Sequence, residues 1–230
     1  MGYFYARGII INTEPLNEKD KIAVLITKDL GKIKVKFKSV RSSKSKRSGF
    51  SEDFIYEDIL LYKKQNFFVA TEVSLIDSYM ELKKSIEDYK ILTYIKEILL
   101  TLLPYEQADP EIFNLLITVL NCLKDSKFKN SATIYFCMLL FKLLGTPILL
   151  PDFVDGDYYF SPEKGGFNRK NGIKVDSSVV KDFLKIYNSK PCEFEEVLDV
   201  ESMFNLINNF VLYHSDSEQY RNFLKAFNKI

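Results

Sequence analysis

The chain has 230 residues, of which 47% are hydrophobic and 27% are charged, as in soluble globular proteins of one large or two ordinary domains. Its longest apolar runs fall short of a membrane span, and Met1–Arg7 does not begin a charged-then-apolar leader, so we expect neither a membrane protein nor a signal peptide. The net charge is only +1, but residues 1–50 carry +8 and the remainder −7, which predicts a polyanion-binding segment joined to a more acidic one.

The first third of the chain predicts β-strands. Short runs rich in β-branched and aromatic residues are separated by turn-prone segments at 12–15, 29–31 and 64–66. The runs are Tyr3–Ile11, Ile22–Thr27, Ile33–Phe37, Phe54–Tyr62 and Phe67–Ile76. Five short strands fit a small barrel, of which the OB-fold is the commonest version that binds nucleic acids. An SH3-like barrel would give much the same pattern, and the number of strands does not separate the two.

After Asp77 the apolar period changes from two to about 3.6, which predicts helices. The first carries its apolar face from Leu82 to Leu102 and ends before Pro104. The second begins after Asp109, and the third, 131–144, is apolar almost all round and should be buried. Further helices are expected at 178–187, 200–213 and 217–227, and the glycine-rich segment from 151 to 176 is expected to be an ordered loop.

These patterns predict an α+β protein with two domains. Residues 1–80 should form the five-stranded barrel, and residues 81–230 should form an all-helical domain with a loop insertion at 146–177. The three cysteines lie far apart and form no CxxC pair. Cys122 and Cys137 fall within apolar helical patterns, so we expect buried, reduced thiols and a cytoplasmic protein.

The most informative stretch is the basic strand at 32–38. Alternation places Ile33, Val35 and Phe37 on the barrel face and lysines on the other, with successive lysines roughly 6.5–7 Å apart. The segment that follows, 39–49, adds four more cations among serines. We predict that DNA phosphates are contacted, without base reading, by Lys32, Lys34, Lys36, Lys38, Arg41, Lys44, Lys46 and Arg47.

A solvated strand whose lysines prevent edge-to-edge aggregation is the alternative interpretation. That role needs one or two lysines, whereas nine cations lie between Lys28 and Arg47 against Asp29 alone. Charges at this density repel one another unless a polyanion offsets them. Base stacking would need exposed aromatic residues nearby, for which Phe50, Phe54 and Tyr56 are candidates, although core packing is the commoner role of such residues.

The sequence offers no recognisable catalytic constellation. His214 is the only histidine, no GxxxxGK[ST] phosphate loop is present, and acidic pairs such as Glu52-Asp53 are adjacent and so do not face each other in a regular element. A two-metal nuclease would need several acids that converge on one pocket. We therefore expect no enzyme, no catalytic residue and no cofactor.

Six segments of the chain form a recognisable pattern when they are taken in order. They are Ala6–Ile10, Asn17–Lys21, Thr27–Ile33, Lys38–Arg47, Leu144–Pro147 and Phe160–Gly166, the last of which is the most specific. In this order they resemble the RecO family of DNA repair proteins, although Ser39 stands where that family usually has glycine. The resemblance covers nearly the whole chain.

This resemblance implies an N-terminal OB-fold, a C-terminal helical domain and a role in DNA repair and homologous recombination. It also implies binding to single- and double-stranded DNA, annealing of complementary strands, and partnership with RecR, single-strand-binding protein and, indirectly, RecA. The DNA contact that the resemblance implies is carried over only onto the basic residues already named. The alternatives are a protein-interaction adaptor or an OB-type RNA-binding module, either with only weak affinity for DNA.

The insertion departs from the family pattern. Many RecO proteins carry two CxxC pairs there, whereas this chain has Asp152–Gly156 at the first and Arg169 and Gly172 near the second. Carboxylates, an arginine and a glycine do not supply a closed tetrahedral set of zinc ligands. We therefore predict no metal, with the loop held instead by Tyr158, Tyr159, Phe160 and its glycine turns.

Overall fold

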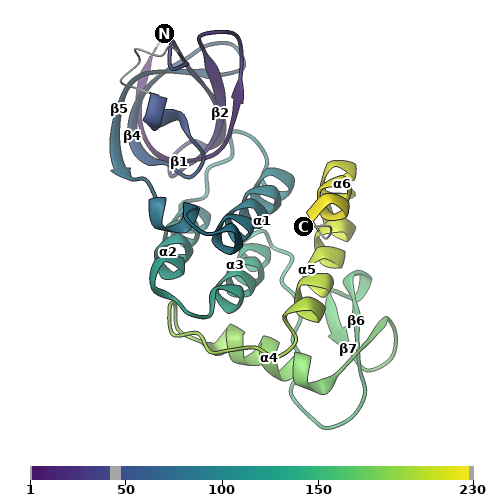
Figure 1. Cartoon of the computed structure of the whole chain (residues 1–230). Helices are drawn as coiled ribbons and strands as arrows, with labels where there is room; N and C mark the ends of the chain where they lie inside the picture. Colours follow the sequence, from purple (N-terminus) through teal and green to yellow (C-terminus); the bar gives the residue numbers. More distant parts are fainter. Residues whose placement is uncertain (1, 42–47, 228–230) are drawn as a thin grey trace. The chain divides into compact units, whose positions relative to one another are not determined.

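The computed structural model describes residues 2–41 and 48–227, and it confirms the α+β class. Five N-terminal strands are followed by helices and a small second sheet. Figure 1 shows this order along the chain. The chain divides into two compact units, residues 1–92 with 103–114, and residues 93–102 with 115–230. The expected domain boundary between residues 80 and 81 stays a prediction.

The first unit is built on a closed five-stranded barrel of the OB-like kind (Figure 1). Its strands follow the order β1-β2-β3-β5-β4, and all neighbours are antiparallel except β3 and β5. The bounds are β1 Tyr3–Pro15, β2 Lys21–Thr27, β3 Gly31–Phe37, β4 Tyr56–Lys63 and β5 Phe68–Asp77. The number of strands and their approximate positions agree with the prediction from sequence.

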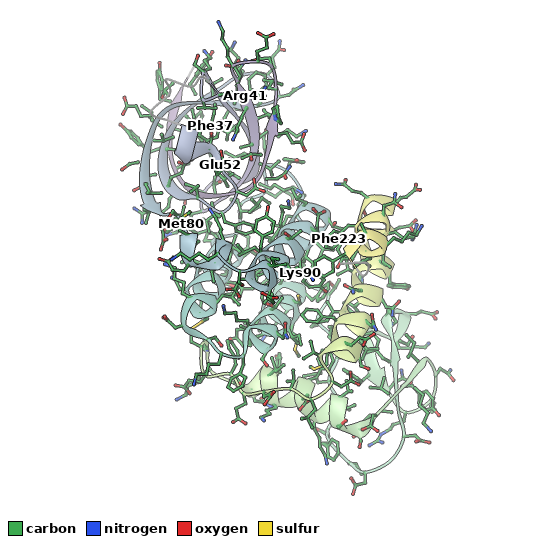
Figure 2. All side chains as sticks on the ribbon, viewed as in Figure 1. Phe37, Arg41, Glu52, Met80, Lys90 and Phe223 are labelled. Atoms are coloured by element: carbon green, nitrogen blue, oxygen red, sulfur yellow. A yellow bond between two sulfur atoms is a disulfide. The ribbon has the colours of Figure 1, made fainter. Side chains whose placement is uncertain are left out.

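The barrel core is formed by alternate residues of each strand. Ile33, Val35 and Phe37 of β3 point inward, as expected, and join Leu25 and Leu61 in one apolar cluster. Figure 2 labels Phe37 within the ring of barrel strands. Because side chains alternate along a strand, this packing turns the intervening lysines of β3 outward. The core therefore fixes the face on which the basic residues lie.

The first strand is longer than predicted. Residues 12–15, expected as a turn, continue the pairing with β2 as far as Pro15 opposite Lys21. A bulge between Ile10 and Asn12 shifts the register, and such a bulge lets one strand bend around a barrel. The actual turn comes after Pro15, which ends the strand because proline has no N–H to donate to the ladder.

The helices lie close to their predicted positions. Their bounds are α1 Ile86–Leu102, α2 Pro110–Asp125, α3 Lys129–Leu143, α4 Ser177–Asn188, α5 Val200–Ser215 and α6 Glu218–Phe227. Asp109 begins α2 as expected, since its carboxylate accepts hydrogen bonds from the backbone N–H groups of Glu111 and Ile112. Leu82, by contrast, lies in a separate 3-10 turn at Met80–Lys83. No helix in the described part of the chain is long and apolar enough to cross a membrane.

The insertion contains a small sheet where an ordered loop was expected. Three strands, β6 Tyr158–Ser161, β7 Gly166–Asn168 and β8 Ile173–Val175, pair in the order β7-β6-β8. They are too short to show a clear alternation in the sequence. Aromatic contacts connect this sheet to the helices, because the ring of Phe160 lies 6.1 Å from that of Phe210 on α5.

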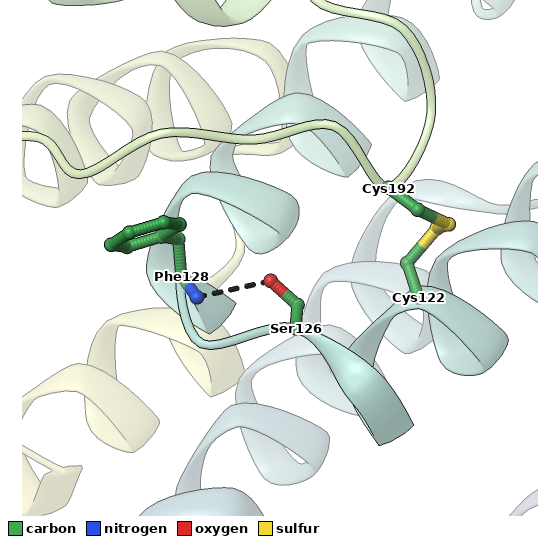
Figure 3. Close-up of a disulfide and its surroundings, with 4 residues drawn as sticks. All are labelled: Cys122, Ser126, Phe128 and Cys192. Atoms are coloured by element: carbon green, nitrogen blue, oxygen red, sulfur yellow. Dashed lines mark hydrogen bonds between the residues drawn. A yellow bond between two sulfur atoms is a disulfide. The ribbon is translucent and has the colours of Figure 1, made fainter.

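A disulfide corrects the expected state of one cysteine. Cys122 on α2 is bonded to Cys192, which lies between α4 and α5 (Figure 3). Cys137 is buried and free, as expected. The pairing was not predicted because Cys192 lies 70 residues away from Cys122, in a segment that carries no periodic pattern.

Candidate nucleic-acid interface

The outer face of β3 presents lysines beside a half-buried apolar strip on β2. Lys34 lies opposite Val24 and Lys36 opposite Ile22 in the antiparallel pair. Lys34 and Lys38 are exposed, and both point away from the barrel core. This part of the predicted row is therefore placed where a polyanion could reach it.

Lys32 departs from the prediction because it is buried. Its side chain is only 4% exposed, and its ammonium group lies 4.6 Å from the ring centroid of Tyr105. Burial, with a smaller contribution from the charge of Lys34, lowers the pKa of Lys32 to about 8. A phosphate cannot reach the buried ammonium group of Lys32 in this structure. Lys32 is therefore not one of the accessible lysines of β3.

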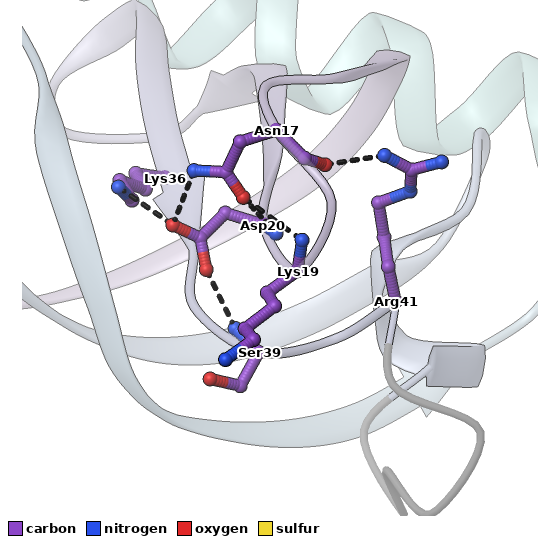
Figure 4. A network of polar contacts seen from close by, with 6 residues as sticks. All are labelled: Asn17, Lys19, Asp20, Lys36, Ser39 and Arg41. Carbon is purple, nitrogen blue, oxygen red and sulfur yellow. Dashed lines mark hydrogen bonds and ion pairs between the residues drawn. The ribbon is translucent and has the colours of Figure 1, made fainter.

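Lys36 is half-buried and already has an acidic partner. Its Nζ lies 2.7 Å from Oδ2 of Asp20, in the turn between β1 and β2 (Figure 4). The same carboxylate accepts hydrogen bonds from the backbone N–H of Ser39 and the side-chain amide of Asn17. The hydrogen bonds from Lys36, Ser39 and Asn17 hold the pKa of Asp20 well below its usual range. The centre of the lysine row is therefore neutralised in the folded protein.

Arg41 is exposed and tied to the same turn. Its guanidinium donates to the backbone carbonyl of Asn17 (Figure 4). Its backbone N–H donates to the carbonyl of Lys19. Lys19 is itself exposed, which adds a cation that the sequence prediction did not include. The neighbouring Glu18 and Asp20 balance Lys19 in the sequence, so local charge gave no signal for it.

Some of the predicted residues lie outside the described part of the chain. They are the cations Lys44, Lys46 and Arg47 and the side chain of Phe50. Phe54 is only 2% exposed, so it belongs to the core. Tyr56 is half-buried and its ring lies 6.1 Å from that of Phe113, so neither Phe54 nor Tyr56 is an exposed stacking surface.

An aromatic residue that the sequence did not single out lies against the basic strand. Tyr105 follows the end of α1, and its side chain is 44% exposed. Its ring centroid lies 5.2 Å from the ammonium group of Lys34 and 4.6 Å from that of Lys32. No local pattern marks Tyr105, because its position depends on contacts with a strand far back in the chain.

The described acids reduce the positive character of this surface. Asp20 pairs with Lys36, and the charge of Glu14 on β1 acts on Tyr105. The pKa of Tyr105 is raised, first by partial burial and then by Glu14. The exposed cations of the face are therefore Lys34 and Lys38 on and beside β3, with Lys19 and Arg41 at the adjoining turn.

The insertion holds no cluster of metal-ligating side chains. The same is true of all the described residues, 2–41 and 48–227, where no group of three or more His, Cys, Asp or Glu side chains could hold a metal ion. Arg169 instead connects the two halves of the insertion. Its Nη2 lies 2.7 Å from the carbonyl oxygen of Val154 and 2.9 Å from the hydroxyl of Tyr158, and its Nη1 lies 3.1 Å from the carbonyl oxygen of Asp157. The absence of bound metal stays a prediction.

Two family models match the chain, Recombination protein O N terminal over residues 1–79 and Recombination protein O C terminal over residues 83–186. A DNA repair protein RecO of Dehalococcoides mccartyi is 31% identical over 191 residues, which cover 77% of this chain and 76% of that protein. A protein of the same name from Caldanaerobacter subterraneus is 26% identical, over 72% of this chain and 70% of its own. A DNA repair protein RecO of Caldicellulosiruptor bescii is 24% identical, over 90% of this chain and 89% of that protein. The similarity thus extends over the barrel and the helices alike.

Proposed function

Because the chain belongs to the RecO family of DNA repair and recombination proteins, we propose that it is a recombination mediator that binds DNA through the outer face of β3. The observation that carries the proposal is the exposure of Lys34 and Lys38 on the face opposite the barrel core. With Arg41 at the adjoining turn, these cations contact phosphates, which fix the position of a strand without reading its sequence.

The proposed mechanism is charge screening. Two complementary strands repel each other through their phosphates, and each cation that contacts a phosphate releases condensed counterions. Two strands held beside one cationic face can then approach, and base pairing supplies the specificity of annealing. No bond of the DNA is made or broken in this mechanism, so we propose that the protein acts without catalysis and without a cofactor.

The partners are proposed on family membership. We propose that the protein binds both single- and double-stranded DNA and works with RecR to help load RecA onto DNA coated by single-strand-binding protein. We propose, accordingly, a cytoplasmic protein that acts at the nucleoid. A face that holds phosphates without reading bases is compatible with handing a strand from one DNA-bound protein to another, since it does not compete for the base edges.

The double charge reversal Lys34→Glu with Lys38→Glu tests the site. Both side chains are exposed, so the fold should be retained while affinity for oligothymidine falls and annealing is lost. The slope of log affinity against log salt, expected at roughly −3 to −4 for four to six phosphates, should become shallower by about 1.4 because two single-strand contacts are removed. Fluorescence anisotropy at several salt concentrations measures both quantities.

The matched control is Lys127→Glu with Lys225→Glu, which changes the net charge equally at exposed positions on the helical part of the chain. This variant should anneal normally. Normal annealing by the β3 variant would rule out the site. A wild-type slope near zero would rule out phosphate binding altogether, and stronger binding to RNA than to DNA of the same sequence would favour an RNA-binding module.

A further inference from the structure

We infer that Tyr105 is a base-stacking position at the edge of the basic strand, so that this face binds single-stranded DNA more tightly than a duplex. This inference rests on the proposed function, because it assumes that the outer face of β3 binds nucleic acid. It adds a contact to the base itself, made by a residue from the connection between α1 and α2.

The position of Tyr105 is fixed by its backbone. Strand β3 pairs with β5 only from Val35 to Phe37, so the edge before Val35 is open to another segment. That edge is taken by the chain at Tyr105, which forms a parallel bridge with Lys32, and the N–H of Glu106 donates to the carbonyl of Lys32 at 2.8 Å. The carboxylate of Glu106 is also paired with Lys63.

Glycine at position 31 permits this close approach. A Cβ added to Gly31 would lie 2.0 Å from the carbonyl oxygen of Gln107, and the backbone of Gly31 has a φ of +70°. Any other residue would therefore force the segment that carries Tyr105 away from β3. The backbone that carries the Tyr105 ring is thus fixed beside the basic strand. Because it is already ordered, less conformational entropy is lost when a ligand stacks on the ring.

The surroundings of the ring combine the two contacts that a nucleotide needs. The ammonium groups of Lys32 and Lys34 lie 4.6 and 5.2 Å from the ring centroid, within the range of cation–π attraction. Lys32 is buried there, but Lys34 is exposed, and 44% of Tyr105 is exposed as well. A base stacked on the open part of the ring would bring its own phosphate close to Lys34. In a duplex the faces of the bases are covered by their neighbours, so this contact favours a single strand.

The other exposed aromatic residues of the barrel lie beside a different strand. Tyr5 is 81% exposed but lies on β1 opposite Leu60 of β4, which is not a neighbour of β3. The cation of that face, Arg7, is paired with Asp58 at 2.8 Å. Tyr5 is therefore a matched control, since it is an exposed tyrosine of the same barrel without an unpaired lysine beside it on β1.

The test compares Tyr105→Leu, which removes the ring, with Tyr105→Phe, which keeps it. Each is titrated against fluorescein-labelled oligothymidine and against an abasic strand of the same length, which has the phosphates but no bases. We expect Tyr105→Leu to weaken binding to oligothymidine roughly five- to tenfold, at the low end for a stacked base because the ring is partly covered, and to leave the abasic strand unchanged. Tyr105→Phe and Tyr5→Leu should bind both strands like the wild type.

Unchanged affinity of Tyr105→Leu for oligothymidine would overturn the inference. So would an equal loss on both strands, which would mean that the substitution had only displaced the lysines. If the wild-type protein binds oligothymidine and the abasic strand equally well, stacking fails while the proposed phosphate contact stands. If it binds neither strand, the proposed function itself fails.

Discussion

The ammonium group of Lys36 and the carboxylate of Asp20 lie 2.7 Å apart, so the turn between β1 and β2 neutralises the middle of the lysine row. The contact joins a turn to a strand and also holds Ser39, the first residue after Lys38. Asp20 is thus placed to limit the positive charge that the basic strand presents to a polyanion. Removal of the Asp20 charge should show by how much the ion pair lowers the affinity for DNA.

Replacement of Asp20 by asparagine should strengthen DNA binding. The amide keeps much of the shape of the carboxylate but frees the charge of Lys36, so the salt dependence of binding to a single strand should become steeper by about 0.7. Glu18→Gln in the same turn is the control, since Glu18 is exposed and its loss changes the net charge equally. Affinity of Asp20→Asn at or below that of Glu18→Gln would contradict this role of the ion pair.

Stability should fall with rising pH because of Glu57. This carboxyl is fully buried in β4, and within the described chain neither of its oxygens has a hydrogen-bond partner. Burial raises its pKa to about 8 from 4.5. The contribution of the protonated carboxyl to the free energy of unfolding is complete below pH 4.5 and is lost as the pH rises through about 8. Between these two values the free energy of unfolding should fall by up to about 1.4 kcal/mol per pH unit.

Glu57→Gln should therefore raise the thermal midpoint at pH 8 and change it little at pH 5. The amide is uncharged at both pH values, so the variant does not lose stability through this group. Glu72→Gln, at an exposed position on β5, should leave the pH dependence unchanged. The same pH dependence in Glu57→Gln as in the wild type would show that the buried carboxyl does not control it.

The insertion should loosen when Arg169 is replaced by alanine. The guanidinium makes hydrogen bonds to Val154, Asp157 and Tyr158, and its central carbon lies 3.7 Å from the centroid of the Tyr158 ring. Loss of these contacts should cost about 1–3 kcal/mol of unfolding free energy. Faster hydrogen exchange at residues 152–158 should accompany it.

Lys170→Ala is the control for Arg169, because Lys170 is the next residue and is exposed. It should leave both stability and exchange unchanged. Equal effects of the two substitutions would mean that Arg169 does not hold the insertion. One equivalent of zinc in chelator-washed wild-type protein would contradict the expectation that the insertion needs no metal.

Reduction of the Cys122–Cys192 disulfide should destabilise the protein. The bond connects α2 to the segment between α4 and α5 and closes a long loop, so its loss should cost about 2–4 kcal/mol. Cys192→Ser should lower the thermal midpoint and make it insensitive to reductant. A wild-type midpoint that reductant does not change would show that the bond contributes nothing to stability.

The sequence predicted the scaffold of the candidate site better than its charges. Alternation in 32–38 was sufficient to place Ile33, Val35 and Phe37 in the core and the lysines outside, because the period of a strand is a local property. It was not sufficient to predict which lysines are accessible. Lys32 is covered by Tyr105, and Lys36 is neutralised by Asp20 from a different turn.

The elements that sequence analysis missed have a common physical cause. The strands of the insertion are three or four residues long, so periodicity could not reveal them. The disulfide and the position of Tyr105 depend on contacts between residues far apart in the chain, which no local pattern encodes. Local signals with a direct mechanism, such as the capping of α2 by Asp109, were predicted correctly.

The bridge between Lys32 and Tyr105 has a practical consequence for dissecting the protein. A fragment cut at residue 80 would contain every strand of the barrel yet lack the residues that complete the edge of β3. The carbonyl of Lys32 would then lose its hydrogen bond from the N–H of Glu106, and its ammonium group, 4% exposed in the intact chain, would lose the cover of the Tyr105 ring. DNA affinities measured on such a truncated barrel would therefore not transfer to the intact chain, because the surface beside β3 would differ.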